Sequence, residues 1–253
     1  MLGDVALLQD IENLQLVRET LPGAAKRRTS IRSYRSPQDS LKEVALHLFD
    51  DRGFKAVTVR DIMEMQGLTA SAMYNHFRSK ELLLASLITG SVGGLEAYLR
   101  VAFSVSDPDN RPARLAALAY AHARYQCEYA PLARVSSNDF VHLPAKAKRE
   151  LATRLLRIRA HQVGVTTEGI KRGEFDIDNP EIAVMEFQGM AAKMSEWYDI
   201  KGPFDPARMS RYHAKLVLRM VGGTTSDAVF DALDDAFTPS RLRSVRPEAA
   251  AAV

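Results

Sequence analysis

The chain repeats apolar residues at the three- and four-residue spacing of an α-helix from about residue 38 to about residue 222. Alternation of apolar and polar residues, which marks a half-buried strand, is scarce over this range. The first clear segment can be capped by Ser36, begins at Pro37 and ends at Gly53. Its apolar stripe consists of Leu41, Val44, Ala45, Leu48 and Phe49. We therefore predict an all-α fold.

Two short helices joined by a tight turn are expected next. Thr58 begins a capping pattern for the first of them, which closes at Gly67. Thr69 can cap the second, which is expected to run to about Phe77. Ser79 then caps a longer helix. This arrangement predicts an N-terminal three-helix domain built around a helix-turn-helix.

The rest of the chain is expected to form a larger helical domain. Turn-forming residues at 106–112 predict a loop. Further along the chain, Gly173 ends the helix that comes before this glycine. An acidic cap followed by proline predicts helix starts at Pro180 and at Pro206. One further short helix is expected from residue 226 to residue 237.

Composition and charge narrow the classes of function. The chain has 253 residues, a formal net charge of +3 and a pI near 9.0, which favours an acidic partner. Its one cysteine, Cys127, excludes an internal disulfide and a cysteine-rich zinc site. The spacing of metalloenzyme histidines, a nucleophile elbow and a phosphate-binding glycine loop are all missing from the sequence. We expect no enzymatic activity, no metal and no cofactor.

The sequence gives no sign of a membrane or an export signal. It contains no uninterrupted apolar run of about 18 residues or more, which a spanning helix requires. Acidic residues interrupt the short apolar stretch at the N-terminus, and no basic region precedes it. We expect a cytoplasmic protein that does not contact a membrane.

A more specific pattern lies between Leu41 and Leu84. Its strongest part is the run Tyr74-Asn-His-Phe-Arg-Ser-Lys-Glu-Leu82. The other matching positions are Ala45, Leu48, Phe49, Gly53, Thr58, Val59, Ile62, Gly67 and Leu83. This pattern resembles the N-terminal domain of the tetracycline-repressor (TetR) family. The resemblance implies a dimeric transcriptional regulator that binds operator DNA in a sequence-specific manner.

The residues of the second short helix fit a reading role. Small or polar side chains at its start let the backbone approach base edges in the major groove. The residues concerned are Thr69, Ala70, Ser71, Ala72 and Asn75. In TetR-like proteins the residues that match Tyr74, His76 and Lys80 contact the DNA backbone, and Thr58 holds a phosphate. Ordinary packing is the alternative for Tyr74 and His76.

The predicted DNA-binding domain is not itself basic. From residue 37 to residue 90 it has six lysines and arginines against seven acidic residues. A basic arm precedes it and contains Lys26, Arg27, Arg28, Arg32 and Arg35. We expect this arm to enter the adjacent minor groove through Arg27 and Arg28. The alternative is a solvated basic linker.

The C-terminal helices resemble the regulatory domain of the same family, whose last two long helices form a dimer interface. We expect a dimer seam made by Met194, Trp197, Met209, Tyr212, Leu216 and Met220. A ligand pocket is expected from His122, Tyr125, Gln126, Tyr129, Phe187 and Met190. Each residue of the two sets has the protein core as its alternative. A small hydrophobic effector would fill the pocket and release the operator.

Two segments, residues 168–175 and 195–198, are similar to members that respond to acyl-CoA thioesters or other lipid-catabolic intermediates. Basic residues such as Arg154 and Arg157 could hold an anionic head group, or they could form a solvated helix face. Two alternatives for the protein remain. One is a drug-efflux regulator that responds to aromatic compounds, and the other is a DNA-binding protein without a ligand.

The chain is thus divided into four parts. These are an N-terminal extension with a basic arm (1–35), a helix-turn-helix DNA-binding domain (36–90), a helical ligand-binding and dimerisation domain (91–222) and a partly disordered C-terminal tail (223–253).

Overall fold

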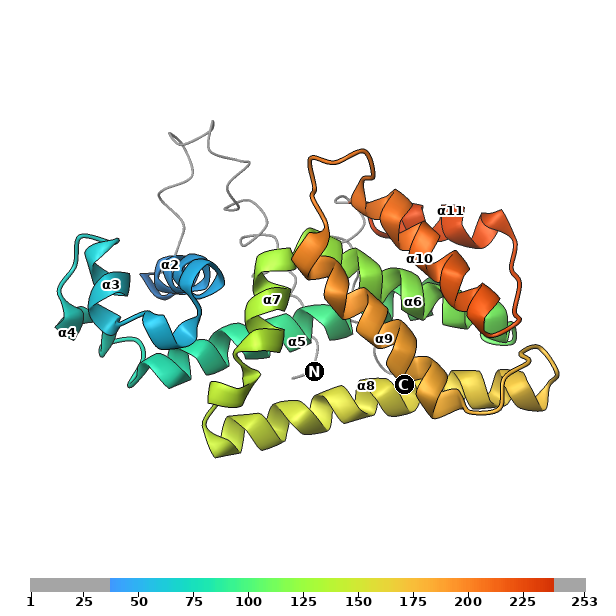
Figure 1. The fold of residues 1–253 in the computed structure, drawn as a ribbon, viewed down its shortest axis with the longest axis horizontal. Coiled ribbons are helices and arrows are strands. Elements are labelled where there is room, and N and C mark those ends of the chain that lie inside the picture. The colour runs from blue at the N-terminus through green and yellow to red at the C-terminus, as the bar shows by residue number, and fades with distance from the viewer. Residues whose placement is uncertain (1–36, 239–253) are drawn as a thin grey trace.

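The computed structural model describes residues 37–238, and all of its regular elements over this range are helices (Figure 1). The predicted all-α class is confirmed. The basic arm with Arg27 and Arg28, the predicted cap Ser36 and the last fifteen residues lie outside the described residues.

A small N-terminal group of helices stands at one end of the molecule (Figure 1). It consists of α2 (Pro37–Arg52), the 3₁₀ turn η1 (Phe54–Ala56), α3 (Val59–Glu64) and α4 (Ala70–Met73). Gly53 and Gly67 follow α2 and α3 with φ angles of 75° and 68°. Left-handed backbone of this kind strongly favours glycine, which explains why both helices end where the sequence predicts.

The caps of these helices agree with the sequence with one exception. Thr58 and Asp61 form the reciprocal capping box of α3, and the Ser79 hydroxyl accepts the amide N–H of Leu82 at 3.2 Å. Thr69 is the N-cap residue of α4, as predicted, but its hydroxyl makes no capping hydrogen bond to the described backbone. It bonds instead to the hydroxyl of Ser71 at 3.0 Å. Helix α4 is also shorter than expected, because residues 74–76 form a turn.

The larger group of helices forms the body. Its helices are α5 (Lys80–Val105), α6 (Arg111–Glu128), α7 (Ala130–Asn138), α8 (Ala145–Lys171), α9 (Pro180–Trp197), α10 (Pro206–Met220) and α11 (Asp227–Ala236), with the 3₁₀ turn η2 (Phe140–His142) after α7. The predicted starts of α9 and α10 are confirmed. Asn179, rather than the acidic residue before it, caps α9, and Asp205 caps α10.

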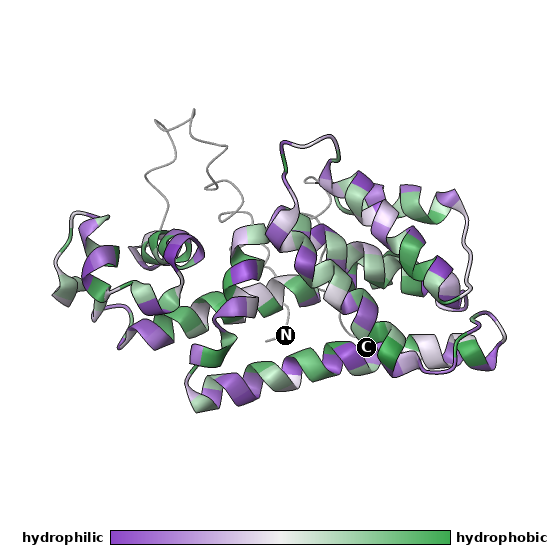
Figure 2. Ribbon diagram, in the orientation of Figure 1, coloured by the Kyte–Doolittle hydropathy of each residue, from purple (hydrophilic) through white to green (hydrophobic). Residues whose placement is uncertain are grey.

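Helix α5 crosses from the small domain into the body without a break (Figure 1). It is hydrophobic along most of its length (Figure 2), and by length and composition alone it could cross a membrane. However, 72% of its most apolar 18-residue window is buried inside the protein. Its apolar side chains therefore serve the core, where one hydrophobic cluster extends from Leu41 in α2 to Phe237 after α11.

The expected C-terminal tail begins with α11, which packs against α5 and α6. Phe230, Leu233 and Phe237 are each 1% exposed. The hydroxyl of Tyr120 in α6 donates a hydrogen bond to Asp234. Residues 223–238 thus contribute to the core of the body, although the sequence placed them outside it.

We expect Phe230→Ala to destabilise the protein by about 3–5 kcal/mol, because a large aromatic side chain is removed from a closed core. Urea denaturation followed by circular dichroism measures the change. Ala232→Ser on the exposed face of α11 is the matched control and should change little. A loss below about 1 kcal/mol for Phe230→Ala would show that α11 does not belong to the cooperative core.

Candidate DNA-binding surface and ligand cavity

Helix α4 and the turn that follows it at residues 74–76 present polar side chains to solvent and are anchored in the core. Ser71, Asn75 and His76 are exposed, and Tyr74 is 55% exposed. Thr69 and Ala70 at the start of the helix are exposed as well. All the residues proposed to face DNA in this helix are therefore accessible in a single copy of the chain.

The anchor of α4 is a residue that sequence analysis did not identify. Met73 is fully buried, and Phe77, one turn later, is 7% exposed. Ala72, which the sequence grouped with the reading residues, is partly buried. The four-residue spacing of two apolar side chains, Met73 and Phe77, was the available signal.

Lys80 and Thr58 are engaged inside the domain. The Lys80 ammonium donates to the backbone carbonyls of Phe54 at 2.8 Å and Val57 at 2.6 Å. It also lies 4.1 Å from the centre of the Phe54 ring. The Thr58 hydroxyl donates to the Asp61 carboxylate at 2.7 Å. Thr58 thus caps α3 as the sequence predicts, whereas the contacts of Lys80 with the backbone around η1 were not evident from the spacing of the motif.

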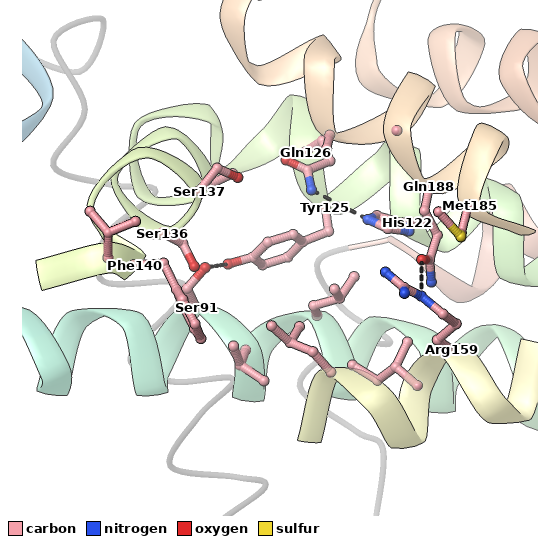
Figure 3. Close-up of a pocket in the computed structure, with 18 residues that line it drawn as sticks. Ser91, His122, Tyr125, Gln126, Ser136, Ser137, Phe140, Arg159, Met185 and Gln188 are labelled. Atoms are coloured by element: carbon pink, nitrogen blue, oxygen red, sulfur yellow. Dashed lines mark hydrogen bonds between the residues drawn. The ribbon is translucent and has the colours of Figure 1, made fainter. Parts of the chain in front are cut away.

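The body contains a cavity of about 580 Å³ bounded by α5, α6, α7, η2, α8 and α9 (Figure 3). Of the six predicted pocket residues, His122, Tyr125 and Gln126 line it. Its other lining residues are Ser91, Val92, Leu95, Ala133, Ser136, Ser137, Phe140, Val141, Leu155, Ile158, Arg159, Met185, Gln188, Gly189 and Ala192. Most of its wall is apolar, with a few polar groups from α5, α6, α7, α8 and α9.

Two buried polar atoms in this wall have no hydrogen-bond partner among residues 37–238. Tyr125 and Ser91 satisfy each other at 2.9 Å, and the side-chain amide of Gln126 lies 3.4 Å from Nε2 of His122 (Figure 3). His122 Nδ1 and Gln126 Oε1 remain unpaired. Leaving such an atom unpaired costs roughly 1–3 kcal/mol. The cavity therefore favours a ligand that is mainly apolar and carries at least one polar group.

The other three predicted pocket residues do not line this cavity. Tyr129 packs against Tyr98 and Tyr125, with ring centres 5.8 and 5.3 Å away. Phe187 is 1% exposed within the core, and Met190 faces outward. The reason is helical phase. On α9 the residues at positions 185, 188, 189 and 192 share the cavity face, which puts positions 187 and 190 on the opposite side of the helix.

The predicted dimer seam is mostly a free surface in the single chain. Trp197 of α9 and Tyr212 of α10 are 60% and 57% exposed, and Leu216 and Met220 are also exposed. Met209 is partly buried. Met194 was placed wrongly, because it is buried against two residues of α6, Ala123 and Cys127.

Helix α7 connects the cavity to the DNA-binding domain. Ala133 and Ser137 face the cavity. Between them Arg134 makes two 2.7 Å hydrogen bonds to the carboxylate of Asp50 in α2, and it donates a third to the backbone carbonyl of Ser195 in α9. This pair of charges is partly buried, and its two-point geometry is the strong form of an ion pair.

Turn η2 adds a second connection between the two domains. The His142 ring stacks on the Phe54 ring of η1, with centres 5.3 Å apart and planes 19° apart. Asp139 beside it is buried, and burial raises the pKa of its carboxyl group. A change in the position of α7 must therefore disturb the contacts that hold η1 and α2.

A helical body with a ligand-sized cavity, joined by one continuous helix to an exposed helix-turn-helix, defines a class of ligand-responsive transcriptional regulators. Comparison with known proteins agrees. The family described as bacterial regulatory proteins, tetR family, matches residues 41–87. The tetracyclin repressor-like C-terminal domain matches residues 108–221. The chain belongs to the TetR family of transcriptional regulators.

Its relatives include the HTH-type transcriptional repressor KstR2. The protein from Mycobacterium tuberculosis is 30% identical over 204 residues, which cover 77% of this chain and 96% of the relative. The one from Mycolicibacterium smegmatis is 28% identical over 200 residues, which cover 75% and 91%.

Solved structures show the same fold. The ketosteroid transcriptional regulator KstR2 of M. tuberculosis matches this chain with a TM-score of 0.67 at 25% sequence identity. The match covers 76% of this chain and 97% of that structure. AibR, solved with isovaleryl coenzyme A and operator DNA, has a TM-score of 0.63 at 17% identity, with 71% and 96% covered. The second likeness supports the fold alone.

Two buried histidines predict how stability depends on pH. Burial lowers the pKa of His122 to about 4, and burial together with His122 lowers the pKa of His213 to about 3. An unfolded histidine titrates near 6.5. As pH falls below that value the unfolded chain binds protons first, so stability should decline from about pH 6.5 towards pH 4.

The double variant His122→Asn/His213→Asn should lose less stability over that range than the natural chain. Urea denaturation at pH 7 and at pH 4.5 measures the difference. His47→Asn, at an exposed site in α2, is the control and should follow the natural chain. Equal pH dependence in the double variant and the natural chain would contradict the assignment.

Proposed function

We propose that this TetR-family regulator is a homodimeric repressor that leaves its operator when a small, mainly apolar ligand fills the cavity. The observation that carries the proposal is the double role of α7. One face of this helix lines the cavity, and Arg134 on the same helix holds α2 of the DNA-binding domain. Occupation of the cavity and the position of the reading helix are therefore mechanically linked.

The DNA contacts follow from the exposed surface of α4. Ser71 and Asn75 lie one turn apart on the solvent side, and we assign them to base edges in the major groove. Tyr74 and His76 are assigned to phosphates, which position the protein without reading sequence. The small Ala70 allows close approach. Further contacts proposed for this interface are Thr69, Lys80 through its remaining N–H, and Arg27 and Arg28 of the arm.

The dimer is supported by the outer faces of α9 and α10. They expose large apolar side chains at helical spacing along each helix, namely Ile182, Met190 and Trp197 on α9 and Tyr212, Leu216 and Met220 on α10. Exposed apolar side chains gathered in this way favour an interaction site. Pairing of the same surface on two chains gives a two-fold axis, which places two reading helices on successive turns of the operator.

The ligand class is inferred from the cavity and from the relatives. A volume of about 580 Å³ is typical of small-molecule sites. The relatives are named for ketosteroid regulation, and one structural neighbour contains an acyl-CoA thioester. An acyl-CoA ester of a lipid-catabolic intermediate fits these observations. The acyl group would occupy the apolar wall, and its polar group would meet His122 and Gln126.

Release from DNA requires that the ligand bind one conformation better than the other. The cavity fits this requirement because its wall is formed by five helices, one of which is α7. A ligand that changes how these helices pack therefore also moves α7. A ligand that favours a shifted α7 weakens the fit of the two reading helices to the operator. By linkage, DNA lowers the affinity for the ligand by the same factor.

We expect Ser71→Ala and Asn75→Ala to change the base preference of the protein, because each removes a polar group from the reading face. Selection of bound DNA from a random pool, followed by sequencing, detects the change. Each variant should lose discrimination at one or two positions in each half-site. Glu64→Gln, exposed on the neighbouring helix α3, is the control. An unchanged consensus for both variants would mean that another face enters the groove.

Arg134→Gln should uncouple ligand from DNA. We expect acyl-CoA esters to lower the DNA affinity of the natural chain by about 5–150-fold, the usual range of coupling. In the variant the ligand should still bind, but its effect on DNA should fall by about tenfold. Fluorescence anisotropy of labelled operator measures both. Arg172→Gln, at the end of α8, is the control. If aromatic drug-like compounds release DNA and no ester does, a drug-responsive regulator replaces this proposal.

A further inference from the structure

A second hollow lies between α5 and α8, outside the ligand cavity. The two helices run side by side in the same direction (Figure 1), and two contacts pin them together. Arg154 makes hydrogen bonds of 3.0 and 2.6 Å to the carboxylate of Glu96. Seven residues further along each helix, the ring of His161 meets the edge of Phe103 at 4.6 Å between centres. The groove between these contacts has a volume of about 540 Å³.

Two arginines that line the groove form no ion pair within the described part of the chain. Arg100 of α5 and Arg157 of α8 line the groove from opposite sides and are exposed. Neither forms an ion pair with a described residue. The one carboxylate that lines the groove, Glu96, is occupied by Arg154. The middle of the groove therefore carries two uncompensated guanidinium groups held on rigid helices.

A third arginine adds positive charge behind the groove. Arg114 of α6 is only 8% exposed, and its Nε and Nη1 atoms have no hydrogen-bond partner among the residues that the structure describes. Its guanidinium carbon lies 3.6 Å from the centre of the Phe103 ring, which lines the groove. Burial lowers the pKa of Arg114, and the charges of Asp107 and Asp109 oppose this shift without forming an ion pair with it among the described residues. A buried and unpaired guanidinium favours an anion nearby.

The floor of the groove is apolar. Leu99, Leu118 and Ile158 line it together with the Phe103 ring. Guanidinium groups bind phosphate oxygens through two parallel N–H bonds, and aromatic and apolar surface suits a base or an alkyl chain. A hydrated chloride or a lone carboxylate would use only part of this surface.

We infer that the groove between α5 and α8 is a binding site for a phosphate-bearing ligand of nucleotide size. Arg100 and Arg157 bind the phosphate oxygens from the two sides, and the ring of Phe103 with Leu99 supports the non-phosphate part. The inference goes beyond the proposed function, because it does not depend on which ligand fills the cavity. Ile158 lines both spaces. The phosphate group has two possible sources, the tail of a nucleotide thioester in the cavity or a separate nucleotide.

The test is isothermal titration calorimetry of the full chain with coenzyme A, ADP, pyrophosphate and pantetheine. Pantetheine has no phosphate and serves as the negative probe. We expect coenzyme A and ADP to bind, and the double variant Arg100→Gln/Arg157→Gln to weaken both by about tenfold or more. The control Lys148→Gln/Arg149→Gln removes the same charge from an exposed part of α8 outside the groove. It should change affinity less than twofold.

Acyl-CoA esters and acyl-pantetheine distinguish the two sources. If the double variant weakens the ester and leaves acyl-pantetheine unchanged, the groove holds the tail of the effector. If it weakens ADP and leaves the ester unchanged, the groove holds a separate nucleotide. Both results support the site. The inference is overturned if neither coenzyme A, ADP nor pyrophosphate binds the natural chain at millimolar concentration, or if the double variant and the control have equal affinity. Thermal melting of both variants confirms that they are folded.

Discussion

One continuous helix has to satisfy the cores of two domains. The first turns of α5 bury Leu83 and Ile88 among the helices of the DNA-binding domain, and its later turns bury Tyr98 and Leu99 in the body. An unbroken helix resists bending between these two sets of contacts. The DNA-binding domain therefore cannot tilt freely. Its orientation is set by the packing of α5 in the body and by the lateral supports from α7 and η2.

The lateral support from α7 explains why the molecule can respond to a ligand. The guanidinium of Arg134 donates hydrogen bonds to Asp50 in the DNA-binding domain and to the backbone of α9 in the body. Few other arrangements of these helices are stable, because separating the pair would leave a partly buried arginine or aspartate without a partner, which costs free energy. Displacement of α7 by a ligand therefore changes which arrangement is stable. The connection is short, since the cavity wall and the ion pair share one helix of nine residues.

Buried polar groups differ in how completely they are satisfied. Glu128 is 1% exposed, yet Arg124 and the hydroxyl of Tyr98 bind its two oxygens at 2.7 and 2.5 Å. This network joins α5 to α6 and stabilises the body. Within the described part of the chain, His122 and Gln126 at the cavity and Arg114 behind the groove have unpaired atoms instead. These three residues border spaces open to ligands, whereas the satisfied Glu128 network holds the fold.

The sequence by itself determined the helices, their ends and the family, because these depend on local patterns. Caps such as Thr58 and helix ends such as Gly53 depend on contacts within a few residues. The family is indicated by the types and spacing of the residues from Tyr74 to Leu82. Only the tertiary structure decided that Lys80 binds backbone carbonyls, that Met194 is core and that α11 belongs to the body. These outcomes depend on how long helices are rotated against one another, and many rotations bury similar apolar area. A one-residue change of phase turns a side chain by about 100°, from core to cavity or from cavity to solvent.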